Sequence, residues 1–163
     1  MRFLLIANLL LFPLAGSAAT SGQPVDAAAA FDRLKALVGS WEAPIKDGKM
    51  TVTYELMAGG TAVVEKDSMN MVTVYYLDGD RLLLTHYCMA GNQPRMQARK
   101  FDSQTGELDF QFLDATNLKS PSAGHMHNAR IRFVDGEHFN AAWQFYEKGE
   151  PKFAEDFQFT RVR

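Results

Sequence analysis

From residue 40 to the C-terminus, short runs of alternating apolar and polar residues are interrupted by turn signals at near-regular spacing. The turns contain glycine, and at 47–48, 78–79 and 135–136 they contain the pair Asp-Gly. Asp-Gly between alternating runs is a strong hairpin signal, because both residues tolerate positive φ. A chain with many such hairpins must stack its strands as a sandwich or close them into a barrel.

We predict about ten strands, joined mostly by tight turns, with one long connection at 114–124. The predicted strands are 40–45, 50–57, 61–67, 71–77, 81–88, 95–101, 107–113, 125–134, 138–146 and 154–162. Sequential hairpins favour an up-and-down meander, which removes its exposed edges by closing. The expected fold is therefore all-β, an antiparallel up-and-down barrel of about ten strands, with a β-sandwich as the alternative.

One helix is expected before the first strand, from about Ala27 to Val38. Asp26 is a suitable N-cap, and Gly39 is a suitable stop at the other end. Apolar residues recur between them at helical spacing, on one stripe. A single helix in this position can plug one end of the barrel.

The N-terminus has the pattern of a secretory signal peptide. Arg2 is a short basic segment, residues 3–14 are almost entirely apolar, and small residues precede a suitable cleavage point at Ala19. The apolar run is too short for a membrane span, which needs about 20 apolar residues. The expected location is therefore periplasmic or secreted, with no membrane span after cleavage. The expected domains are a signal peptide at 1–19, a flexible leader at 20–25 and a barrel domain at 26–163.

Charge and cysteine content restrict the partners of the chain. The formal net charge is −2 and no basic patch is visible, so nucleic acid is not expected as a partner, because its phosphates require Lys and Arg. The single cysteine, Cys88, cannot form an intramolecular disulfide, which leaves burial, a free thiol or an intermolecular bridge. The sequence gives no oligomeric state.

The junction between the helix and the first strand carries a resemblance to a known superfamily. Gly39-Ser40-Trp41 resembles the Gly-x-Trp signature of calycin barrels, which include lipocalins and fatty-acid-binding proteins. Those proteins commonly place an arginine of the last strand over this tryptophan, and Arg161 is the matching residue here. A guanidinium over an indole is a favourable cation–π contact. The resemblance implies structural roles for Gly39, Trp41 and Arg161.

A longer likeness runs through most of the chain after the leader. The segments "KALVGSWEA", "LDGDRLLLTHYCMAGNQPRM" and "HMH", in this order, are similar to a family of exported bacterial barrels of unknown function. That family is distantly similar to the nitrobindin-like haem barrels. The resemblance carries over no catalytic residue. It implies only a late histidine that ligates haem inside the barrel, and His125 and His127 are late enough.

Three histidines are expected on inward strand faces. In one strand His86 and Cys88 share the face of two leucines, and in a later strand His125 and His127 share the face of three apolar residues. Because a meander reverses direction at each strand, the end of the first strand and the start of the later one lie at the same mouth. We therefore expect the three histidines and the thiol to approach one end of a cavity.

Two further residues are predicted to line this cavity. Trp143 shares the apolar face of its strand and should point inward. Arg95 follows Pro94 at the start of a strand, where it can meet an anionic group at the rim or lie in solvent.

The predicted site allows three kinds of function. A His-x-His pair has Cα atoms roughly 6–7 Å apart on one face, which suits either a polar cavity lining or chelation. His86, His125 and His127 are therefore candidates for a transition metal or haem, although no cofactor is predicted. Pairing of Cys88 with His86 as nucleophile and base has no signature here, so an enzyme is the least favoured reading. We favour the binding of a small apolar or amphipathic molecule in a His-lined cavity.

Overall fold

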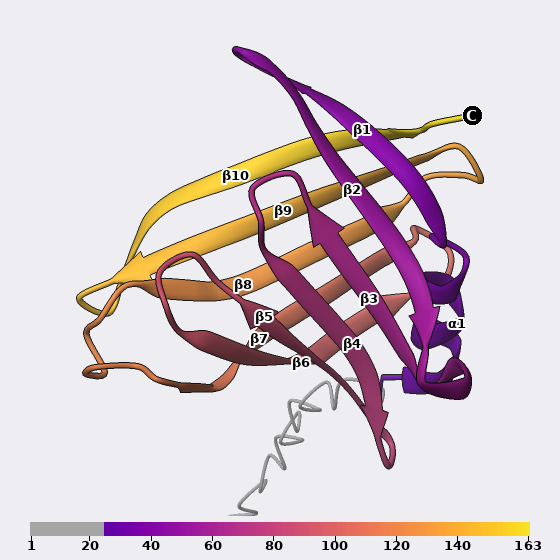
Figure 1. Ribbon diagram of the computed structural model, residues 1–163. Helices are drawn as coiled ribbons and strands as arrows, with labels where there is room; N and C mark the ends of the chain where they lie inside the picture. Colours follow the sequence, from indigo (N-terminus) through magenta and orange to yellow (C-terminus); the bar gives the residue numbers. More distant parts are fainter. Residues whose placement is uncertain (1–24) are drawn as a thin grey trace, which may run out of the picture.

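The computed structural model describes residues 25–163, which form a closed barrel of ten antiparallel strands preceded by one helix (Figure 1). The predicted all-β, ten-stranded up-and-down barrel is confirmed. The predicted signal peptide at 1–19 and almost all of the leader at 20–25 lie outside the described residues. Within residues 25–163, no helix has the length and hydropathy that crossing a membrane requires.

Each strand pairs with the next one in the chain, and β1 pairs with β10 to close the barrel. The elements are α1 (Ala27–Lys35), β1 (Gly39–Ile45), β2 (Gly48–Met57), η1 (Ala58–Gly60), β3 (Ala62–Asp67), β4 (Val72–Asp78), β5 (Arg81–Tyr87), β6 (Gln93–Asp102), β7 (Glu107–Thr116), β8 (His125–Phe133), β9 (His138–Glu147) and β10 (Glu150–Arg161). The long connection between β7 and β8 is shorter than predicted, because β7 continues to Thr116.

Helix α1 covers one end of the barrel, which we call the closed end (Figure 1). The carboxylate of Asp26 accepts a hydrogen bond from the backbone of the first turn, so this residue is the N-cap, as predicted. Phe31 and Leu34 are buried on the face that packs against β4, β5 and β6. The helix ends at Lys35, before the predicted Val38, because the next residues form tighter turns that lead into β1.

Arg161 joins the last strand to the first strand and to the helix. Its guanidinium carbon lies 4.1 Å from the ring centroid of Trp41. The same group donates hydrogen bonds of 2.9, 3.0 and 2.9 Å to the carbonyl oxygens of Val38, Ala36 and Gly136. Arg161 therefore satisfies carbonyls at the end of the helix and in the β8–β9 turn at once.

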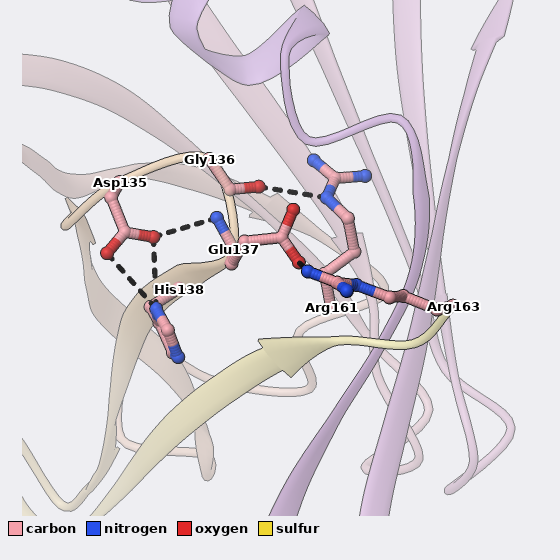
Figure 2. A network of polar contacts seen from close by, with 6 residues as sticks. All are labelled: Asp135, Gly136, Glu137, His138, Arg161 and Arg163. Carbon is pink, nitrogen blue, oxygen red and sulfur yellow. Dashed lines mark hydrogen bonds and ion pairs between the residues drawn. The ribbon is translucent and has the colours of Figure 1, made fainter.

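Gly39, Trp41 and the β8–β9 turn surround the Arg161 side chain. Gly39 has φ +129°, and a Cβ atom there would lie 2.8 Å from Nη1 of Arg161. The indole N–H of Trp41 donates to the carbonyl of Leu37 at 2.7 Å. Figure 2 shows the adjoining β8–β9 turn, where the Asp135 carboxylate contacts His138.

Candidate functional site

The interior of the barrel is mostly apolar and contains one row of polar side chains. The inward side chains of β8 and β9 are mostly apolar or aromatic, among them Ile131 and Phe139. On β2, β3, β4 and β5, four polar side chains are direct cross-strand neighbours with 7% exposure or less. We call these four residues the polar row: Tyr54, Glu65, Thr73 and His86.

Two residues of the polar row, Glu65 and His86, are held by hydrogen bonds, and burial changes the pKa of each. Oγ1 of Thr73 lies 2.9 Å from Nδ1 of His86, and the Tyr75 hydroxyl donates to the Glu65 carboxyl at 2.7 Å. Burial raises the pKa of Glu65 to about 7, although hydrogen bonds from Tyr75 and Tyr54 act in the opposite direction. Burial lowers the pKa of His86 to about 4, so this imidazole is neutral at pH 7.

The second ring nitrogen of His86 has no partner. Its Nε2 is buried and makes no hydrogen bond to any residue from 25 to 163. The ring packs against Trp143 of the opposite wall, with 4.9 Å between the centroids, and this contact together with Thr73 fixes its orientation. An unsatisfied buried polar atom costs about 1–3 kcal/mol, so this nitrogen is an open position for a ligand or a water.

Asn92 carries a second buried atom of this kind. Its Nδ2 donates to the carbonyl of Gly124 at 2.8 Å, whereas its Oδ1 has no partner among the described residues. The Cys88 N–H donates to the Asn92 carbonyl, so the two residues are opposite each other where β5 turns into β6. Asn92 therefore lies beside the end of β5, at the end of the barrel away from α1, which we call the open end.

An inner pocket lies beside the polar row. It is lined by Glu65, Asp67 and His86 on one side and by Trp143 and Glu155 on the other. Burial raises the pKa of both Asp67 and Glu155, which lie toward the open end. The cavity volume is about 20 Å³, on a measure in which one water needs about 10–15 Å³. The inner pocket therefore has room for a single water as it stands.

The predicted convergence of the three histidines on one cavity is wrong. His86 lines the inner pocket, whereas His125 and His127 line a separate groove formed with the ends of β7 and β9 and the loop 117–124. We call it the histidine groove. The residue between the two histidines, Met126, is the one that lines the inner pocket.

A β-bulge in β8 is the physical reason for this separation. Met126 pairs with Phe145 and Asn128 pairs with Gln144, so three residues of β8 correspond to two of β9. Because of the extra residue, the even-numbered Met126 points inward before the bulge, and the odd-numbered residues from Ala129 onward point inward after it. His125 and His127 therefore leave the face that Ala129 and the residues after it occupy.

The other predicted site residues are also divided. Trp143 lines the inner pocket, but Arg95 does not, because it bonds the carboxylate of Asp114 on the neighbouring strand. Cys88 is half-buried against the core, and burial raises the pKa of its thiol. Cys88 is thus a protonated thiol at pH 7, without a hydrogen bond to His86.

The histidines do not fit a haem inside the barrel. Neither His125 nor His127 lines the inner pocket, and the volume there is that of about one water. Residues 25–163 also bring together no group of three or more His, Cys, Asp or Glu side chains suited to a metal ion. The three candidate metal-ligating histidines, His86, His125 and His127, therefore do not form one site in this arrangement.

Comparison with known proteins gives no family for this chain: no protein-family profile matches it, and no curated protein matches it. Its functional interpretation rests on the geometry of the inner pocket and the histidine groove. Three residues described above were not predicted as site residues: Glu65 lines the inner pocket, Thr73 bonds His86, and Asn92 carries the second unpartnered atom. Glu65 did carry a signal, since it shares strand parity with the buried Val63.

Proposed function

We propose that this protein is an exported, calycin-like barrel that binds a small amphipathic molecule at its open end. The observation that carries the proposal is the pair of buried, unpartnered atoms, Nε2 of His86 and Oδ1 of Asn92. His86 lines the inner pocket, and Asn92 directly precedes β6, the strand that pairs with β5. No other buried side-chain nitrogen or oxygen of residues 25–163 lacks a hydrogen-bond partner. Each of these open positions is suited to a polar group of a ligand.

The head group is expected to be uncharged and to carry hydrogen-bond donors. Oδ1 of Asn92 can only accept, and Nε2 of His86 donates or accepts according to its tautomer. The inner pocket also contains three carboxyl groups and, among its described lining residues, no lysine or arginine. A carboxylate head would be repelled there, whereas an uncharged primary amide or hydroxyl can bond to Nε2 of His86.

The apolar tail requires the pocket to enlarge. Met50, Met71 and Met126 line the pocket from separate parts of the barrel. Methionine side chains are unbranched and adapt to irregular shapes at low cost. A ligand larger than water therefore displaces these side chains toward the open end, while His86 and Trp143 keep their places.

Export and family relationship are part of the proposal. Export is supported by the signal-peptide pattern at 1–19. A calycin-like relationship is supported by the closed barrel, the helix at one end, and the contact of Arg161 with Trp41.

The test uses three probes of equal chain length: decanamide, 1-decanol and sodium decanoate. Isothermal titration calorimetry on the purified protein should show binding of the amide and the alcohol, with decanoate weakest. The double variant His86→Phe with Thr73→Val should weaken decanamide about 3- to 10-fold, the value of one hydrogen bond. His138→Phe, at an exposed histidine of the closed end, is the matched control and should leave the affinity for decanamide unchanged.

Two results would reject the proposed site. One is decanoate as the tightest of the three probes. The other is decanamide affinity that the His86 and Thr73 double variant leaves unchanged. Asn92→Leu gives an independent check, since it removes the other open position and should also weaken the amide.

A further inference from the structure

The histidine groove has the size and walls of a binding site. It has a volume of about 470 Å³ and is lined by apolar and aromatic side chains that include Phe112, Leu118 and Tyr146. His127 is stacked between two of them, at 4.8 Å from Phe112 and 4.1 Å from Tyr146, measured between ring centroids. With both faces covered, His127 can meet a ligand only with the edge of its ring.

Hydrogen bonds determine which nitrogen of His127 carries the proton. The Ala123 carbonyl can only accept, so Nδ1 of His125, 2.8 Å away, is the donor. In neutral His125 the Nε2 atom then accepts, and Nδ1 of His127 donates to it at 2.9 Å. Burial and the adjacent His125 lower the pKa of His127, which favours its neutral form. Nε2 of His127 is left as an acceptor with no partner among the described residues.

The lining of the groove that the structure describes presents no unpaired charge. Its one carboxylate among the described lining residues, Asp114, is bound through both oxygens by the guanidinium of Arg95. No lysine or arginine is among those lining residues. A charged ligand would therefore lose its hydration without gaining an opposite charge.

We infer that the histidine groove is a second binding site, which takes an uncharged aromatic molecule bearing a hydroxyl or N–H group. The donor of the ligand bonds to Nε2 of His127, and its ring lies against the apolar walls. A volume of this size is typical of sites for small molecules. The chain from Ala123 through His125 to His127 fixes the acceptor before the ligand arrives, which lowers the entropy cost of binding.

The test compares 2-naphthol with 2-methoxynaphthalene, which has the same rings but no donor. Calorimetry on the purified protein should show 2-naphthol binding about 3- to 10-fold more tightly, as one hydrogen bond predicts. His127→Phe keeps a flat ring between Phe112 and Tyr146 but removes Nε2. In this variant the two probes should bind equally. The double variant His86→Phe with Thr73→Val alters only the inner pocket and should keep the preference.

A second measurement uses the unmodified protein, so it does not depend on the folding of a variant. Nitrogen-15 NMR of labelled histidine should show His127 protonated on Nδ1 and unprotonated on Nε2 at pH 7.5, and the Nε2 signal should move when 2-naphthol is added. Equal affinities for the two probes in the unmodified protein would overturn the inference. So would a proton on Nε2 of the free protein, or a preference that disappears in the His86 and Thr73 variant.

Discussion

The two ends of this barrel differ in how their polar atoms are paired. At the closed end, Arg161 donates to three backbone carbonyls and the Trp41 indole donates to a fourth. At the open end, His86 and Asn92 each keep one buried atom without a partner. The difference indicates that the closed end stabilises the fold, whereas the open end retains unsatisfied positions that a ligand can use.

The largest effect is expected at the closed end. Trp41→Ala removes a side chain of 1% exposure that packs edge-on against Phe139 at 4.9 Å, and should lower the free energy of unfolding by about 3–5 kcal/mol. Chemical denaturation measures this value. Tyr87→Ala, at an exposed aromatic residue of the open end, is the control and should lower the free energy of unfolding far less. Unchanged stability of the Trp41 variant would refute the role given to the closed end.

The polar row should make stability depend on pH through Glu65. Its pKa is about 7 in the folded protein and 4.5 in the unfolded chain, so between these values the folded state binds more protons. The contribution of Glu65 to stability is therefore complete below pH 4.5 and is lost as the pH rises to about 7. The loss amounts to up to about 3 kcal/mol. Denaturation of the wild-type protein and Glu65→Gln from pH 4.5 to 8 should show the two curves diverging. Parallel curves would contradict a buried, protonated Glu65.

A smaller loss is expected when Arg161 is replaced by lysine. Arg161→Lys keeps the positive charge but cannot reach three carbonyls with one planar group, and should cost about 1–2 kcal/mol. Arg163→Lys is the matched control, because Arg163 is an exposed neighbour whose one side-chain ion pair within residues 25–163 is with Glu137 (Figure 2). Thermal denaturation of both variants measures the difference. Equal losses would show that the carbonyl contacts do not stabilise this end.

The smallest effect, with the opposite sign, is expected at the open end. The double variant His86→Phe with Thr73→Val removes both partners of one hydrogen bond together with the unpartnered Nε2. Its stability without ligand should equal that of the wild-type protein or exceed it by up to about 1 kcal/mol. Denaturation in urea at pH 7 measures this. A loss of more than about 1 kcal/mol would show that Nε2 is already satisfied in the free protein, for example by a water.

The strand order and the barrel could be predicted because their signals are local. Alternation and Asp-Gly turns are properties of neighbouring residues, and the strands lie within a few residues of the predicted ranges. The predicted ranges were wrong at two element ends, the C-terminus of the helix and the start of the last strand. Helix α1 stops before Val38, and β10 starts at Glu150 because it continues past a bulge near Pro151.

The candidate site could be predicted only in part, because it depends on register. Parity placed His86 and Trp143 inside the barrel, and both line the inner pocket. The same parity failed for His125 and His127, because alternation in the sequence continues unbroken through the bulge that reverses the inward face. Glu65 was missed for a different reason: charged residues are almost never fully buried unless paired, and its partner Tyr75 lies on another strand.

The sequence by itself determined the fold class and the order of the strands, because each follows from patterns among neighbouring residues. Only the tertiary structure decided which polar side chains meet. Tyr54, Glu65, Thr73 and His86 form one row because the registers of three strand pairs align them. One extra residue in β8 sends His125 and His127 to a different groove. Register and bulges arise from pairing between strands, so they are fixed by the packing of the whole barrel rather than by any single stretch of chain.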